Sequence, residues 1–470
     1  MLMRALHTGV SGLQVSQAGL SAVGHNIANV DVDGYSRQRV ELAANAPTLL
    51  GAGPHFYGNG AGVQTVSRAN DEFLERQSRR DLTQLGFLDA RAGTMDAIER
   101  LYSQSSDPDL GGALDGFFNT ARELTQEPGD FSVRRAFSQS AQTVALAFNT
   151  LDRDMRTLQR GIDDTLTDKM NRVNELGKTI AEMNAKIVSS ELENRQANDF
   201  RDVREQALRE LSTLVDVNAM AQPDGSMTVE IEKFALLVQG DRSARLQGTP
   251  NAANFGLIDV EYVGINNQVK NLTGLLTTGE IGGLLNVRDV RLNQDLASLD
   301  QLAATFATEV NTQHQVGFDL TGTSNRQFFL PPVAPPGTAA NLAVDPVILG
   351  NPDFIAASQS GLTLPGDNRN MLLIADLQNL RQAGLGNVTF NRRFSQLLHD
   401  VGLSAQDNRQ RLEVSKVKSE QSENLRESVE GVSIDDELID LTKFQKHFEA
   451  SSRVISTVDQ LLDTVLQLIQ

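Results

Sequence analysis

Residues 434–469 read IDDELIDLTKFQKHFEASSRVISTVDQLLDTVLQLI, and every seventh position of this stretch is a large apolar residue. The same spacing occurs near the start of the chain, in residues 6–27. Apolar residues seven positions apart are typical of helices that pack along one another in a coiled coil. We therefore expect both ends to be helical and to pack on each other or on copies of themselves. The residues at this spacing are Leu6, Leu13, Leu20 and Ile27, and Ile434, Leu441, Phe448, Ile455, Leu462 and Ile469.

The N-terminal segment also carries a stripe of small residues. Gly9, Gly12, Ser16 and Gly19 recur at alternating steps of three and four, which would let a second backbone come close. Each glycine costs a helix about 1 kcal/mol relative to alanine, so we expect this segment to be helical only when packed. One amphipathic helix docked on its own domain would explain a single apolar seam. Two matching seams favour an assembly protein over an enzyme.

Composition limits the possible partners. The 470 residues, 40% of them hydrophobic, are enough for two to four domains. A net charge of −18 argues against nucleic acid or an anionic membrane surface as partner, because both repel a negative field. The chain has no cysteine, which excludes disulfides and thiol chemistry. We also expect neither a cleaved signal peptide nor a transmembrane span, since no continuous apolar stretch is long enough.

The interior reads as helices with a β-rich insert. Helical patterns cover about 70–126, with breaks at Asp107-Pro108 and Pro128-Gly129, and continue over about 132–215. A shift in the apolar spacing after Ile162 predicts a stutter or a break there. Alternating apolar residues around Pro223-Asp224-Gly225 predict a β-hairpin over 215–231. Seven of the thirteen prolines fall within 331–365, which favours loops and edge strands there.

These patterns predict a mainly α fold with a β-rich insert, in three discontinuous parts. Residues 1–32 with 431–470 would form a terminal coiled-coil domain. Residues 33–215, 284–316 and 366–430 would form a helical-bundle domain. Residues 216–283 with 317–365 would form an outer β domain.

Catalytic and metal-binding motifs fail on their spacing. No two of the six histidines stand four residues apart, as a zinc site on one helix requires. The glycines of 58–62 lack the residues of a phosphate loop, and the acidic turn at 31–34 lacks those of a calcium loop. The acidic triplet 435–437 follows Ser433 and suits a helix N-terminus. We therefore expect no enzyme activity, no cofactor and no metal.

Several short motifs then resemble a known family, the axial proteins of the bacterial flagellum, which include rod, hook and hook-associated subunits. At the N-terminus these are Gly12-Leu13, Gln17, Gly19-Leu20, Asn26-Ile27-Ala28-Asn29 and Gly34-Tyr35. At the C-terminus they are Leu441, Phe444-Gln445, Phe448, Ala450-Ser451, Val454-Ile455 and Asp459. The resemblance departs from the family pattern at Val32, where threonine is usual, and at Phe448, where tyrosine is common.

Interior residues are similar to the hook-associated members that join hook and filament. They are Ser36-Arg37-Gln38, Gly60-Ala61-Gly62-Val63, Arg68, Asp71, Phe73-Leu74, Asn311, Gln313-His314, Gly317-Phe318-Asp319, Phe328-Phe329 and Asn368-Arg369-Asn370. Three alternatives stay open: a hook or distal rod subunit, an extracellular enzyme with its site in 216–365, and a cytoplasmic coiled-coil scaffold.

The resemblance implies a structural protein, exported unfolded through the flagellar type III apparatus and located outside the cell at the hook–filament junction. Its implied partners are further copies of itself in a ring, the hook protein, the second junction protein and a cytoplasmic export chaperone on the C-terminal helix. The expected assembly residues are Leu6, Leu13, Gln17, Leu20, Asn26, Ile27, Asn29, Gly34, Tyr35, Leu441, Phe444, Gln445, Phe448, Ile455, Leu462 and Ile469.

Overall fold

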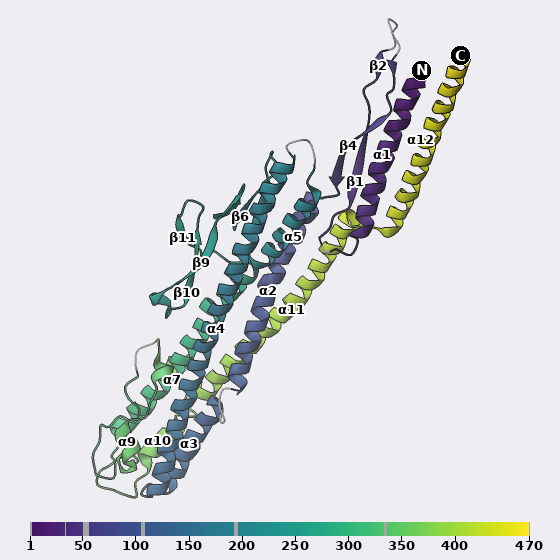
Figure 1. The fold of residues 1–470 in the computed structure, drawn as a ribbon. Coiled ribbons are helices and arrows are strands. Elements are labelled where there is room, and N and C mark those ends of the chain that lie inside the picture. The colour runs from purple at the N-terminus through teal and green to yellow at the C-terminus, as the bar shows by residue number, and fades with distance from the viewer. Residues whose placement is uncertain are drawn as a thin grey trace.

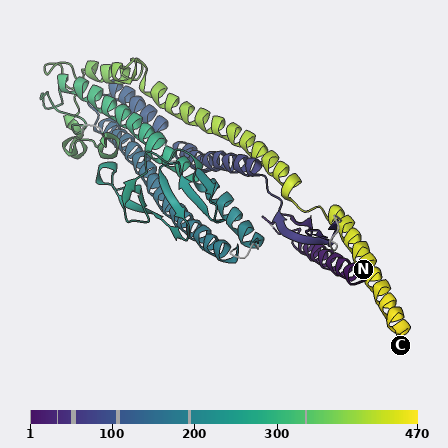
Figure 2. The ribbon, with the colours of Figure 1, turned by 90° about the horizontal axis from the view of Figure 1, so that it is seen from above.

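The chain is an elongated molecule with its two ends side by side (Figure 1). The structure, a computed structural model, describes residues 2–32, 34–49, 56–104, 109–191, 196–332 and 336–469. Helix α1 (Leu2–Ala28) lies along helix α12 (Ile434–Ile469), and this pair projects from one end of a long helical body. Seen from above, the same pair extends away from the body as a narrow arm (Figure 2).

The body consists of long helices that run along its length. They are α2 (Glu72–Gln104), α3 (Leu110–Gln126), α4 (Phe131–Glu191), α5 (Asn198–Leu214), α6 (Gly279–Leu285), α7 (Leu292–Val316), α10 (Arg369–Asp376) and α11 (Phe390–Glu430). A π-helical turn, Asn286–Arg291, joins α6 to α7. The predicted break at Pro128-Gly129 falls between α3 and α4, and the one at Asp107-Pro108 lies outside the described residues. Proline restricts the residue before it to extended backbone, which ends a helix.

Phenylalanine rings form the centre of the core where α3, α4 and α7 meet. Phe117 stands at its middle, with its ring centroid 4.9 Å from that of Phe137 and 5.2 Å from that of Phe306. Phe328 and Phe329 join the same cluster and are fully buried. Aromatic rings in such tilted and edge-to-face contacts contribute more than their buried area alone.

Helix α4 is longer and more regular than the sequence predicts. It runs without a break through the shift after Ile162, because Leu166 continues the buried stripe between Ile162 and Met170. The predicted break at this point is therefore wrong, whereas the two successive four-residue steps from Ile162 to Leu166 to Met170 are those of a stutter. The chain instead leaves the helix after Glu191 and resumes helix at Asn198.

Two small antiparallel sheets lie on one side of α4 (Figure 1). The first pairs β5 (Val217–Ala221), β6 (Met227–Ile231), β7 (Ala235–Gln239) and β8 (Arg242–Ser243) in that order. The second pairs β9 (Arg245–Pro250), β10 (Ile258–Val263) and β11 (Val269–Asn271). Asn184 of α4 donates from Nδ2 to the carbonyls of Met227 and Gly240, at 2.8 and 2.9 Å. The mainly α fold with a β-rich insert is thus confirmed.

Residues 317–365 differ from their predicted place in the β domain. They contain the short helices α8 (Thr338–Asn341) and α9 (Pro346–Gly350) and pack on α4 and α7 at the end of the body, away from β5–β11 in Figure 1. Buried Asp300 of α7 accepts from the backbone N–H groups of Gly337 and Ala339, both at 2.7 Å. The grouping of 317–365 with 216–283 is corrected because Phe328 and Phe329 belong to the core of the body.

Residues 38–68 also differ from prediction, which assigned them to the helical bundle. Strand β1 (Gln38–Ala44) pairs antiparallel with β4 (Ala61–Arg68), with a bulge at Glu41/Leu42. The short strands β2 (Thr48–Leu49) and β3 (Phe56–Tyr57) extend this ribbon. The ribbon lies along α1, so this segment accompanies the terminal helices and not the body.

Candidate assembly interface

The contact between α1 and α12 is centred on the small residues of α1. A Cβ atom added to Gly9 would stand 2.7 Å from Cγ1 of Ile455, and one added to Gly19 would stand 2.6 Å from Cγ of Phe444. A Cβ on Gly12 would overlap Ser451 in the same way. Real Cβ atoms essentially never come this close to other atoms. The two backbones are therefore as close as glycine permits.

The leucine seam predicted on α1 flanks this contact. Leu6, Leu13, Leu20 and Ile27 are all half-buried, whereas Gly9, Ser16 and Gly19 are buried. Gln17, a further expected interface residue, is exposed. The seven-residue spacing thus located the helix and its packed side, and the stripe of small residues marks the centre.

On α12 the structure places the expected residues unevenly. Leu441, Phe444, Ile455 and Leu462 are half-buried on the side that faces α1, while Gln445 and Phe448 are exposed. Ile434 is exposed at the start of the helix, and the side chain of Ile469 lies outside the described residues. Val458 is almost fully buried in the same contact. Sequence reasoning missed it because it stands three residues after Ile455 and not seven.

Asn26 and Tyr35 tie the ribbon to α1. Asn26 donates from Nδ2 to the carbonyl of Gln38 at 3.0 Å, and its Oδ1 accepts from the Gln38 backbone N–H at 2.9 Å. The hydroxyl of Tyr35 donates to the same Oδ1 at 2.8 Å. Burial, followed by nearby Asp202, raises the pKa of Tyr35, so this hydroxyl keeps its proton and stays a donor. These residues shape the subunit itself.

The remaining two expected residues form the turn that follows α1. The Nδ2 of Asn29 donates to the carbonyl of His25 at 2.8 Å, and the same carbonyl accepts from the Asn29 backbone N–H at 3.2 Å, which closes the end of the helix. Gly34 has φ of +80°, and a Cβ there would stand 2.8 Å from Nη2 of Arg209. Glycine is required for both reasons.

Arg37 joins the terminal pair to the body. Its backbone N–H donates to the carbonyl of Glu430 at the end of α11, at 2.8 Å. Its guanidinium donates from Nε to Oε1 of Glu437 at 2.6 Å and lies 3.3 Å from Oδ2 of Asp440, both on α12. The Arg37 side chain is 14% exposed and that of Glu437 only 1%. A buried ion pair therefore sits where α11 gives way to α12.

The acidic triplet at the start of α12 has a second role that the sequence did not reveal. Ser433 caps the helix as expected, with its Oγ 3.5 Å from the N–H of Asp436. Glu437, however, faces Arg37, a residue 400 positions away in the chain. No local spacing in the sequence signals this partner.

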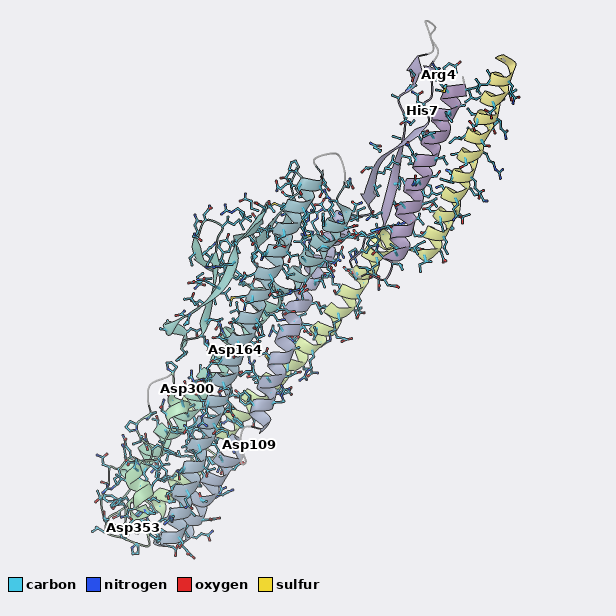
Figure 3. All side chains as sticks on the ribbon, viewed as in Figure 1. Arg4, His7, Asp109, Asp164, Asp300 and Asp353 are labelled. Atoms are coloured by element: carbon cyan, nitrogen blue, oxygen red, sulfur yellow. The ribbon has the colours of Figure 1, made fainter. Side chains whose placement is uncertain are left out.

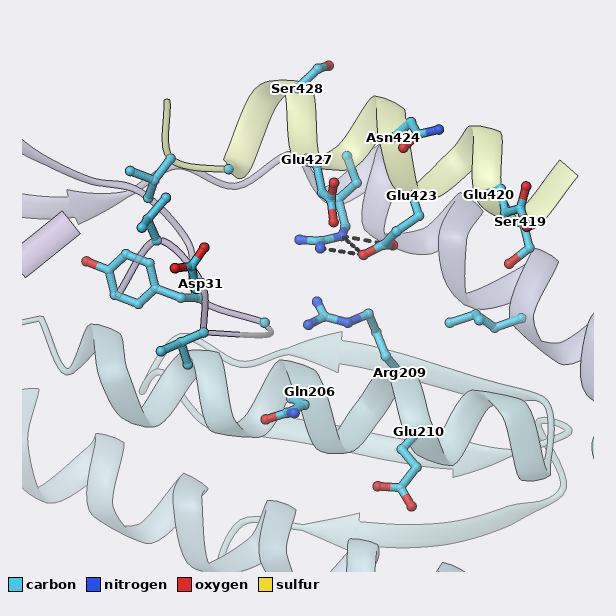
Figure 4. Close-up of a pocket in the computed structure, with 18 of the residues that line it drawn as sticks. Asp31, Gln206, Arg209, Glu210, Ser419, Glu420, Glu423, Asn424, Glu427 and Ser428 are labelled. Carbon is cyan, nitrogen blue, oxygen red and sulfur yellow. Dashed lines mark hydrogen bonds and ion pairs between the residues drawn. The ribbon is translucent and has the colours of Figure 1, made fainter. Parts of the chain in front are cut away.

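More buried charges line the body beside this joint. Arg79 donates to Glu205, and Arg426 lies 3.1 Å from Glu430. Burial, and then the neighbouring Glu205 carboxylate, raises the pKa of Glu75 to about 9, so Glu75 is protonated at neutral pH. An open pocket of about 1070 Å³ borders the cluster, and Arg209 of α5 and Glu423 of α11 face each other across it (Figure 4).

Among the described residues, no group of three or more histidine, aspartate or glutamate side chains could hold a metal ion. The labelled acidic residues of the body, such as Asp109, Asp164 and Asp353, lie far apart along it (Figure 3). Within the same stretches of the chain, every helix falls short of the length and apolarity that crossing a membrane requires.

Both terminal helices keep apolar residues exposed in the single chain. On α12, Ile439, Val454, Leu461, Val465 and Leu466 are exposed. On α1, Met3 and Val10 are exposed, in the same stretch of the helix as Arg4 and His7, which Figure 3 labels. Apolar surface of this kind is typical of a face that binds another protein.

Comparisons with known proteins agree with this arrangement. Residues 95–329, half of the chain, match the model of the flagellar hook-associated protein FlgK helical domain. Residues 427–468 match the model of the flagellar basal body rod FlgEFG protein C-terminal region. The first match covers the body, and the second covers the helix that pairs with α1.

Curated relatives cover almost the whole chain. Flagellar hook-associated protein 1 of Salmonella typhimurium is 27% identical over 550 aligned positions, covering 98% of each chain. The Escherichia coli protein of the same name is 25% identical, covering 98% of this chain and 99% of the relative. The solved flagellar hook junction protein FlgK from Burkholderia pseudomallei has a TM-score of 0.67 at 16% identity, covering 75% of this chain and all of that one.

The fold combines a helical body, an inserted sheet and two terminal helices packed together, and the two family models match its body and its C-terminal helix. These features define an axial protein of the bacterial flagellum. The chain belongs to the flagellar hook-associated protein FlgK family, that of hook-associated protein 1. The similarity of the interior residues to hook-associated members is thereby confirmed.

Proposed function

We propose that this chain assembles through α1 and α12 into a ring that joins the flagellar hook to the filament. The observation that carries the proposal is the apolar surface left exposed on both terminal helices of the single chain. Burying a side chain such as Leu461 or Val465 stabilises by about 1.5 to 3 kcal/mol, so a row of them is a strong drive to associate. The names of the relatives support the location.

In this proposal the molecule is layered around the axis of the flagellum. The terminal residues 1–32 and 431–470 form the inner layer, together with the ribbon of 38–68. The helical body surrounds them, and the sheets of 217–271 face outward. The joint at Arg37 connects the inner layer to the body.

Export precedes assembly in the same proposal. The chain travels unfolded through the flagellar type III apparatus, and its glycine-containing N-terminal helix becomes ordered only when it packs in the ring. A cytoplasmic chaperone covers the C-terminal helix before export, because that helix would otherwise expose its apolar side. The partners after export are the hook protein, the second junction protein and further copies of the chain.

One alternative is a hook or distal rod subunit, which the match of residues 427–468 to the rod-protein C-terminal model would also suit. The match of residues 95–329 to the FlgK helical domain favours the junction.

The test replaces exposed apolar residues of α12 in the full-length chain, in cells that lack the native copy. The double substitution Leu461→Asp and Val465→Asp is expected to leave hooks without filaments and to release the chain into the medium. The matched control is Gln460→Asp, an exposed polar position on the same helix. Normal filaments in the double variant would contradict the proposal, and immunogold labelling along the hook or the rod would favour the alternative.

A further inference from the structure

The outer face of α11 presents apolar residues to solvent at the spacing of a coiled coil. Val414 is 65% exposed, Val417 58% and Leu425 47%. Neighbouring positions on this face continue steps of three and four residues. The residues of this face, here called the α11 seam, are Val414, Val417, Gln421, Asn424, Leu425 and Ser428.

The opposite face of α11 is the one that packs on the body, and it is polar there. Ser415, Ser419 and Ser422 are buried against α2, and Ser422 donates to Oδ2 of Asp81 at 2.5 Å. This is the reverse of an ordinary surface helix, which turns its apolar side inward. The upper half of α11 therefore places its serines inside and its valines outside.

The α11 seam is also hollowed. A shallow groove of about 430 Å³ runs along it, lined within this helix by Val417, Gln421 and Leu425 together with intervening polar residues. In a coiled coil, side chains of one helix insert into such hollows on the next. Gln421 and Asn424 fall at seam positions, where a polar residue fixes the register of two helices at some loss of stability.

Position and charge select a second copy of the chain as the partner. Only residues 431–433 separate α11 from α12, so a neighbour packed along α12 would continue along α11. The chain as a whole carries a net charge of −18, which makes copies repel. Residues 414–428, which span the seam, are different, with three basic and three acidic side chains. Like-charge repulsion between copies is therefore small at this face.

We propose that the α11 seam binds a helix of a second copy of this chain, so that neighbouring subunits pack along their bodies as well as along their terminal helices. The proposal rests on the proposed function, because it takes the neighbour from the ring. It adds a surface that the terminal pairing does not require.

The first test places a photo-crosslinking amino acid, benzoylphenylalanine, at Val417 of the full-length chain assembled on cells. The control position is Lys416, which is exposed on the flank of the same helix. A second position, Leu461 on α12, reports on the terminal contact. The expected result is an adduct of two copies from position 417, identified by mass spectrometry, with a clearly lower yield from position 416.

The outcomes separate the two proposals. The α11 seam proposal fails, and the proposed function stands, if position 417 crosslinks to a different protein. The same conclusion follows if position 417 gives no adduct while position 461 crosslinks two copies. If neither position yields an adduct of two copies, both proposals fail.

A second test uses charge. Val417→Asp is expected to lower incorporation of the chain into flagella about 10- to 100-fold relative to a co-expressed native copy, because the contact of one valine buried between subunits is lost. Lys416→Asp is the matched control. Thermal unfolding of the purified Val417→Asp chain should match the native chain, since the side chain is exposed. Equal incorporation of the two variants would refute the proposal.

Discussion

Replacement of Gly19 by alanine tests the close approach of α1 and α12. The added Cβ would stand 2.6 Å from Cγ of Phe444, so the ring or the helix must move. Overpacking of this kind costs about 1 to 3 kcal/mol. Alanine also favours the helix itself by about 1 kcal/mol. Gly24→Ala makes the same gain without the clash, because a methyl group at Gly24 would meet no neighbouring element of the chain within 4 Å.

The difference between the two variants therefore isolates the packing cost. Helix propensity cancels, which leaves about 1 to 3 kcal/mol, or roughly a 5- to 150-fold difference in the equilibrium for assembly. The assay co-expresses each variant with the native chain from matched promoters. The ratio of variant to native chain in purified flagella is then divided by their ratio in the exported pool.

Gly24→Ala is expected to be incorporated at least as well as the native chain, and Gly19→Ala far less well. Equal incorporation of the two variants would refute the reasoning. It would mean that α12 is not packed against the glycine stripe in the assembled state.

Three further predictions concern buried ionisable side chains. Arg37→Gln leaves Glu437 buried without a cation, a loss of about 3 to 5 kcal/mol that should lower incorporation into flagella sharply. Arg39 is exposed, so Arg39→Gln should leave incorporation unchanged. The double variant Arg37→Met with Glu437→Leu should recover most of the lost incorporation. Burial lowers the pKa of His314 to about 4, below its ordinary 6.5, so the unfolded chain takes up this proton first. The stability that neutral His314 contributes is complete above pH 6.5 and falls by about 3 kcal/mol as the pH drops to 4. Denaturant unfolding at a series of pH values should show this pH dependence of the unfolding free energy in the native chain and in His399→Gln, and should not show it in His314→Gln. Glu75 has its pKa raised to about 9, above its ordinary 4.5, so it adds stability below pH 4.5 that is lost as the pH rises to 9. Glu75→Gln mimics the protonated form at every pH, so it should match the native chain below pH 4.5 and be more stable than the native chain at pH 7. Glu205→Gln leaves Arg79 unpaired and should lose about 3 to 5 kcal/mol at pH 7. The opposite order of the two variants would contradict the protonated state of Glu75.

Local patterns predicted much of the fold because the signals are local. The heptad spacing marks α1 and α12, the proline at 128 marks a helix end, and the Pro223-Asp224-Gly225 turn marks the β5–β6 hairpin. Residues 317–365 were misplaced because an apolar pair such as Phe328-Phe329 indicates burial, but its sequence does not indicate which part of the molecule will bury it. The phenylalanine partners that decide this lie up to about two hundred positions away.

The candidate interface was predicted in outline and not in detail. Phe444 and Ile455 face the glycine stripe of α1, but Gln17, Gln445 and Phe448 lie exposed. The sequence marks Arg37 only through its family resemblance. Its role depends on Glu437, Asp440 and the carbonyl of Glu430, which only the folded chain brings together.

The joint at Arg37 has a mechanical consequence. The buried apolar residues described in the arm belong to neither apolar cluster found in the described part of the body; they are Val15, Ala22, Val23 and Val458. Force applied to the arm would thus pass into the body through the connecting chain and through directional ion pairs and backbone hydrogen bonds, not through a shared apolar core. Such a connection would act as a compliant coupling between arm and body, and salt would change it little, because a buried ion pair is screened far less than an exposed one.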